Sequence, residues 1–151
     1  MLLSFMVVRG LTLNMTKTDT PNPQAQRQAR LLRIFANDLT IACNNYARTV
    51  PAGEGALTSD ARVWIDRTFR RDIRFLEQRM DDNKVTGLPT YLALRAAVHR
   101  CAAMARYPDD RTLRRETFKD VRQAIAGVTA FIDATAMTES AGFLPERILF
   151  D

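Results

Sequence analysis

Apolar residues recur every three or four positions through four stretches of the chain. This spacing is typical of one face of an α-helix, and it predicts helices over residues 23–48, about 59–80, 88–106 and 111–136. No stretch after Met15 alternates apolar and polar residues as a half-buried strand does. The pattern therefore predicts an all-α protein, a single-domain bundle of about four helices with an irregular C-terminal tail.

Cap and turn residues separate these helices. Asn22 followed by Pro23 is typical of an N-cap and a first helical position, and proline or glycine interrupts the chain between the later helices. A polar stretch begins at Met15, which would make residues 1–14 an upstream-start artefact or, if they are translated, a sticky apolar arm. We therefore expect an N-terminal arm over 1–22, a helical bundle over 23–136 and a C-terminal tail over 137–151 that packs on the body or on a partner.

The apolar arcs of the helices identify the expected core. The third helix is apolar nearly all the way round, which predicts a central position for it. The residues expected to be buried are Leu31, Ile34, Phe35, Leu39, Ile41, Ala42 and Tyr46 in the first helix, Trp64, Ile65, Phe69, Phe75, Leu76 and Met80 in the second, and Phe118, Val121, Ile125, Val128 and Ile132 in the fourth.

Polar side chains fall inside these apolar arcs. Asp38 and Asn45 lie within the arc of the first helix, and Asp72 lies within that of the second. Arg95 and His99, one turn apart, form part of a narrow polar stripe on the third helix. A charge buried alone costs several kcal/mol. Arg95 or His99 is therefore predicted to pair with one of the two aspartates across the core.

This polar set has a structural and a catalytic interpretation. In the catalytic one, a carboxylate orients His99 as a general base and Arg95 binds an anionic substrate, as a small hydrolase or nuclease would require. The sequence favours a structural ion-pair network, because no nucleophile or metal-ligand set accompanies these residues. The spacing of Arg95 and His99 is too short for the Arg-His motif of the HEPN ribonucleases, which are also helical bundles, so no family is assigned.

Basic residues gather on the second helix. The chain carries a formal net charge of +5, and nearly all of its bases are arginine. Asp66 and Glu77 stand at helical spacing from two of the arginines, so a solvated, partly compensated face is one interpretation. The other is a binding site for an acidic protein or for nucleic acid. This arginine strip consists of Arg67, Arg70, Arg71 and Arg74.

Several classes of chemistry lack their sequence signals. Cys43 and Cys101 stand far apart and match neither a zinc-site spacing nor a disulfide framework. The chain has no phosphate-binding glycine loop and no nucleophile elbow, so we predict no metal and no cofactor. No apolar run approaches the roughly 18 residues of a membrane span, and we therefore expect a cytoplasmic protein without a membrane partner.

Together these observations favour a non-enzymatic accessory protein, of bacterial or phage origin, that acts by binding another macromolecule. A protein partner or a second copy is the expected occupant, docked through the arginine strip or the apolar segments 1–8 and 143–150. One alternative is a nucleic-acid-binding protein that uses the arginine strip. Another is a small hydrolase or nuclease that uses His99 and Arg95.

Overall fold

The structure is a computed structural model, and its described part is helical except for short connections and the last five residues. Within that part the predicted all-α bundle of four helices is confirmed. The N-terminal arm over 1–22 and residues 137–146 of the tail lie outside the described residues. The structure describes residues 23–53, 55–83, 85, 88–135 and 147–151.

The helices begin where the sequence places their caps. The Thr58 hydroxyl accepts a hydrogen bond from the Ala61 N–H, and the Asp110 carboxylate accepts one from the Leu113 N–H, so each side chain satisfies a free donor of a first turn. Three of the segments are contiguous and form one long second helix with a π-helical turn inside it. The elements are α1 (Pro23–Thr49), α2 (Ser59–Trp64), η3 (Ile65–Phe69), α3 (Arg70–Asp82), α4 (Pro89–Arg106) and α5 (Arg111–Ala134).

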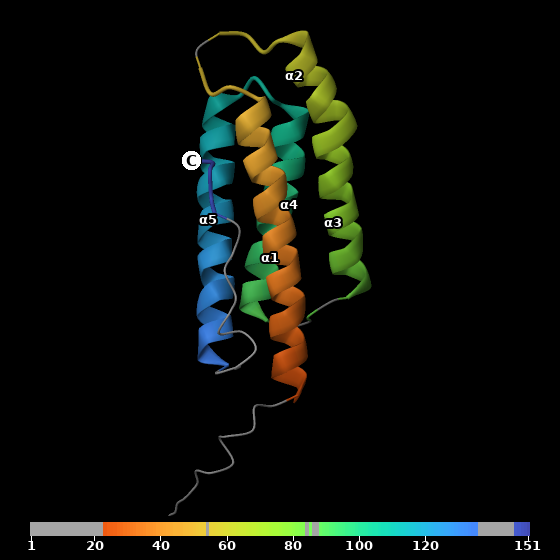
Figure 1. Cartoon of the computed structure of the whole chain (residues 1–151), viewed down its shortest axis with the longest axis vertical. Helices are drawn as coiled ribbons and strands as arrows, with labels where there is room; N and C mark the ends of the chain where they lie inside the picture. The colour runs from red at the N-terminus through yellow and green to blue at the C-terminus, as the bar shows by residue number, and fades with distance from the viewer. Residues whose placement is uncertain (1–22, 54, 84, 86–87, 136–146) are drawn as a thin grey trace, which may run out of the picture.

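Helices that follow one another in sequence lie side by side and run in opposite directions (Figure 1). The helix formed by α2, η3 and α3 packs against α1 and α4, and α5 closes the bundle between α4 and α1. The prediction of a central third helix is wrong, because α4 occupies one corner and leaves Leu92 59% exposed. Much of its broad apolar arc is alanine, whose small side chain loses little by facing water.

Two thiols meet at the centre of the bundle. Cys43 of α1 and Cys101 of α4 are fully buried. Their sulfur atoms lie 3.7 Å apart and share a hydrogen bond but form no disulfide. Burial raises the pKa of Cys43 well above its usual value, and the hydrogen bond and charge of Cys101 add to the effect. Both residues therefore act as small core residues.

The buried stripe of α5 is as predicted, whereas three large residues of the other arcs are not buried. Ile34 and Ile41 of α1 are 46% and 43% exposed, and Phe75 of α3 is 59% exposed. The prediction for these three is wrong because each lies at the edge of its predicted arc, and Ile41 and Phe75 lie on the side of the bundle where α1 meets α3. Ile73, two positions before Phe75, is buried in the core instead.

An aromatic cluster fills the core beneath the connection between α1 and α2. The Tyr46 ring packs edge-on against Phe69 and Phe118, with ring centres 4.7 and 5.9 Å away. Its hydroxyl is buried and has no hydrogen-bond partner among the described residues. Burial raises the pKa of Tyr46 from 10.0 to about 12, partly offset by the charge of Arg114.

The raised pKa of Tyr46 predicts a loss of stability at alkaline pH. The folded protein holds the phenol proton more tightly, so this stabilisation is complete below pH 10.0 and is lost as the pH rises towards about 12. Tyr46→Phe removes a buried hydroxyl without a described partner, so it is expected to be at least as stable as the wild type at neutral pH. Between pH 10 and pH 12 its free energy of unfolding is expected to fall by about 2 kcal/mol less than that of the wild type. Urea denaturation across this range tests the prediction, and parallel pH profiles of the two proteins would contradict it.

The last five residues contact both α1 and α5 and lie beside them in Figure 1. The Asn44 side chain accepts a hydrogen bond from the Leu149 N–H at 2.7 Å and donates one to the Arg147 carbonyl at 2.6 Å. Phe150 is buried, and its ring centre lies 4.9 Å from that of Phe118. Asn45, the polar residue that the sequence places in this arc, is only partly buried, and Asn44 beside it is the buried amide.

Candidate anion-binding site

The two aspartates of the predicted polar set pair with arginines of α3. Asp38 accepts a hydrogen bond from Arg79, and an Asp72 oxygen lies 3.4 Å from Arg71. The predicted pairing of these aspartates with Arg95 or His99 is therefore wrong. Both aspartates face the junction of α1 and α3, whereas α4 meets α3 on the other side of that helix.

Arg95 and His99 share a different carboxylate, Glu77 of α3. An Arg95 nitrogen lies 3.1 Å from a Glu77 oxygen and another lies 3.2 Å from Asp81, while the His99 Nδ1 lies 3.5 Å from Glu77. Burial lowers the pKa of Arg95, but Asp81 and Glu77 outweigh that effect and raise it overall. Since the His99 side chain is 69% exposed, this arrangement is a surface ion-pair network between α3 and α4.

Two of the four arginines in the strip on the second helix pair with aspartates of the same helix. Arg70 pairs with Asp66 one turn earlier, at 3.3 Å, and Arg71 pairs with Asp72. Arg67 and Arg74 have no ion pair or hydrogen bond within the described part of the chain. The strip is therefore an exposed face whose charge is partly neutralised by its own helix.

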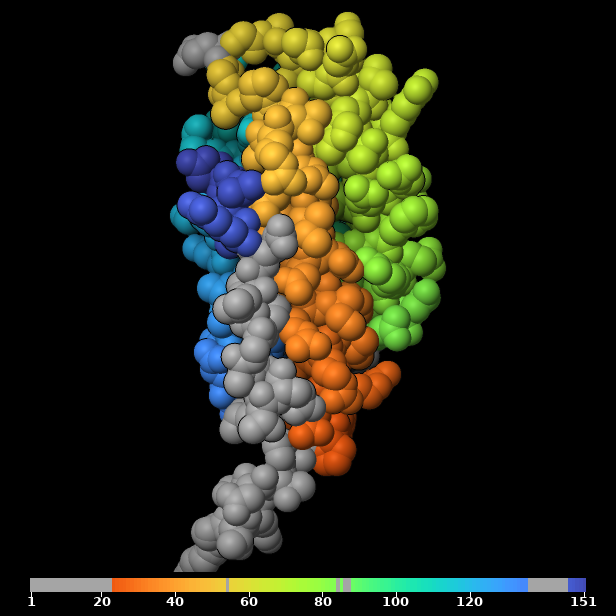
Figure 2. Space-filling model, in the orientation of Figure 1, coloured from red at the N-terminus to blue at the C-terminus, as the bar shows by residue number. Residues whose placement is uncertain are grey.

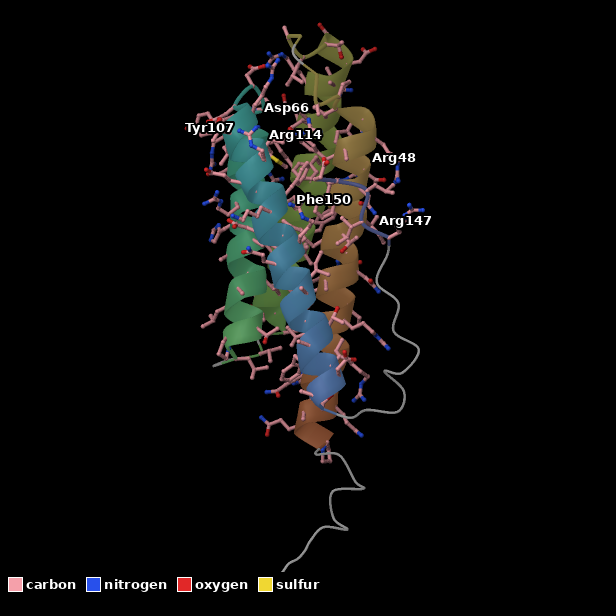
Figure 3. The ribbon with its side chains drawn as sticks, turned by 90° about the vertical axis from the view of Figure 1, so that its left-hand side faces the viewer. Arg48, Asp66, Tyr107, Arg114, Arg147 and Phe150 are labelled. Carbon is pink, nitrogen blue, oxygen red and sulfur yellow. The ribbon has the colours of Figure 1, made fainter. Side chains whose placement is uncertain are left out.

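A second group of arginines lies on α5 and lines a pocket together with the C-terminal residue Asp151. It surrounds a surface pocket of about 410 Å³, which we call the arginine pocket. Asp151 is the one carboxylate among the described residues that line it. In Figure 3, Arg114 and Phe150 lie at this face, and the ribbon of residues 147–151 runs beside α5. The pocket is lined by Ala52, Arg111, Arg114, Arg115, Arg122 and Asp151.

The aromatic core beneath the pocket positions Arg114. Its guanidinium carbon lies 5.3 Å from the centre of the Tyr46 ring and 5.4 Å from that of Phe118, which is the range of a cation–π contact. It also donates a hydrogen bond to the Pro51 carbonyl. Desolvation lowers the pKa of Arg114, against smaller opposing effects of Tyr46 and Asp151. An incompletely solvated cation of this kind gains most from a bound anion.

Two other arginines of the pocket have unused donors. Arg115 is exposed, and Arg122 is partly buried with its Nη1 atom shielded from solvent and without a hydrogen-bond partner. Neither residue takes part in an ion pair within the described ranges. Guanidinium groups with free N–H donors beside one another fit the oxygens of a phosphate better than a lone lysine would.

The arginines of this pocket were not among the predicted site residues, although they share one face of α5 in the sequence. Arg111, Arg114, Arg115 and Arg122 fall within about 100° of arc around Phe118 when successive residues are turned by the helical step. The arginines flank Phe118, which belongs to the apolar stripe of the same helix, so the helical pattern assigns this face to the core. The contribution of Asp151 and Ala52 depends on tertiary packing.

The class of protein defined by this geometry is an antiparallel four-helix bundle with a basic pocket on its fourth helix. Comparison of the chain with family models, with curated proteins and with solved structures finds no match. No helix in the described ranges is both long enough and apolar enough to cross a membrane. The residues that the structure describes contain no group of three or more potential metal ligands.

Proposed function

We propose that this chain is a non-enzymatic nucleic-acid-binding protein that holds the phosphate backbone at the arginine pocket. The observation that supports this most is the convergence of four α5 arginines with only one described carboxylate beside them. Binding a phosphate diester would supply acceptors for the unused donors of Arg115 and Arg122 and a counter-charge for Arg114.

The length of the arginine group favours a polymer over a small anion. Arg111 and Arg122 are separated by 11 positions, or about 16 Å along a helix. Phosphates follow one another about every 3.4 Å along one strand of a duplex, so about four or five of them span this distance. The described residues of the lining include no asparagine or glutamine to read adenine, so we expect contacts to the backbone with little sequence preference.

The proposal differs from the protein partner that the sequence favours. Two of the four arginines of the strip pair with carboxylates of their own helix, whereas Asp151 is the one carboxylate among the described residues that line the pocket on α5. The catalytic alternative has less support, because Arg95 pairs with Glu77, the exposed His99 lies beside the same carboxylate, and neither Arg95 nor His99 lines the arginine pocket.

Fluorescence anisotropy of a labelled generic duplex tests the proposal. Four phosphate contacts predict that the logarithm of the association constant falls with the logarithm of salt concentration with a slope of about −3 to −4. Unlabelled polyglutamate at equal charge serves as a competitor and is expected to displace the duplex poorly. No binding at low salt would overturn the proposal, and so would displacement by polyglutamate as effective as that by unlabelled duplex.

A further inference from the structure

A second surface, unrelated to the arginine pocket, lies between α1 and α3. Ile41 and Phe75, two of the residues that the sequence assigns to the core, lie at this surface, and both are exposed. They border a groove of about 420 Å³, visible in Figure 2 between the orange surface of α1 and the green surface of α3. The residues that line this α1–α3 groove are Asp38, Ile41, Ala42, Asp72, Phe75, Leu76, Gln78 and Arg79.

The charges at the groove are already paired within the chain. Asp38 pairs with Arg79, which bridges α1 and α3, and Asp72 pairs with its neighbour Arg71. These two aspartates and two arginines leave no net charge in a molecule whose formal net charge is +5. A strongly acidic or basic partner therefore has little to recognise in this groove, whereas an identical neutral surface meets it without repulsion.

The shape of the groove suits the same surface of another molecule. Phe75 stands on one wall, and the small side chain of Ala42 lines the other. A cavity of about 150 Å³ is enough to hold benzene, which has the size of a phenylalanine ring. At about 420 Å³ the groove, which its own Phe75 helps to line, has room for the Phe75 ring of a second molecule related by a two-fold axis.

We infer that the α1–α3 groove is the interface of a two-fold symmetric homodimer, with Phe75 of each copy inserted beside Ile41 of the other. Such an interface buries the apolar residues that the helical arcs of α1 and α3 place towards a core. It leaves the arginine pocket uncovered, because that pocket lies on α5 beside the C-terminal segment. The inference does not depend on the proposed function.

Sedimentation velocity of the full chain, from micromolar to submillimolar concentration, tests this interface. The wild type is expected to shift from monomer to dimer over the series, and Phe75→Asp is expected to raise the dissociation constant at least a hundredfold. Leu92→Asp is the matched control, because Leu92 is also 59% exposed but lies on α4 outside the groove. Its dimerisation is expected to equal that of the wild type, and circular dichroism checks that each variant is folded.

Two results would overturn the inference. A wild type that stays monomeric throughout the series would assign the groove to another occupant, such as a segment of this chain or a different protein. A dimer that survives Phe75→Asp but is lost in Leu92→Asp would place the interface on α4.

Discussion

Changing both Arg115 and Arg122 to glutamine is expected to weaken duplex binding by about 10- to 100-fold near 0.1 M salt and to reduce the salt slope by about 2. These residues are the arginines of the pocket that have no partner within the described part of the chain. Each therefore contributes a full charge, and its removal breaks no ion pair or hydrogen bond with the described residues. Anisotropy titrations at several salt concentrations measure both the affinity and the slope.

The arginine strip on the second helix supplies a closely matched control. Arg67 and Arg74 also lack partners in the described residues and are also seven positions apart, so the double glutamine variant loses the same charge with the same spacing. This variant is expected to change the affinity for the duplex less than threefold, because the strip would act on the duplex only through the long-range electrostatic field of the protein. Equal losses in the two double variants would show that only net charge matters. A loss confined to the Arg67 and Arg74 variant would place the interface on the strip.

The fold could be predicted from the sequence because helical periodicity, caps and turn residues all agree. Pro23 begins α1, and the stripe from Phe118 to Ile132 on α5 is buried as its spacing indicates. The same periodicity cannot say how many neighbours a helix has. Ile41 and Phe75 belong to apolar arcs, yet a bundle of four leaves the edge between α1 and α3 uncovered.

The site was harder to predict because its charges depend on partners from other helices. Arg95 was expected to meet an aspartate inside an arc, but the register of α3 against α4 brings Glu77 and Asp81 to it instead. The pattern along one helix predicts the direction in which a side chain points. It does not predict which residue of the neighbouring helix faces that side chain. The arginine pocket could not be predicted for the same reason, because its lining includes Asp151 from the end of the described chain, which no pattern along α5 indicates.

Asn44→Ala is expected to lower the free energy of unfolding by about 2 to 3 kcal/mol and to release residues 147–151 from the bundle. The buried Asn44 amide accepts a hydrogen bond from the Leu149 N–H and donates one to the Arg147 carbonyl. It therefore satisfies two backbone groups of the C-terminal segment, as the backbone of a neighbouring β-strand would. Alanine leaves these two backbone groups without partners against an apolar groove, so the segment gains by moving into water. Urea denaturation measures the stability, and hydrogen exchange at the Leu149 amide reports the release.

Asn45→Ala controls for the loss of an amide from the same helix. Asn45 is partly exposed and accepts a hydrogen bond from Arg48, an interaction of the surface that is expected to contribute less than about 0.5 kcal/mol. Equal destabilisation by the two variants would contradict the anchoring role of Asn44. Since the anchored segment brings Asp151 to the arginine pocket, its release removes a carboxylate that competes with phosphate. The Asn44 variant is therefore expected to be less stable and yet to bind duplex at least as tightly as the wild type, whereas weaker binding would make the segment itself part of the nucleic-acid surface.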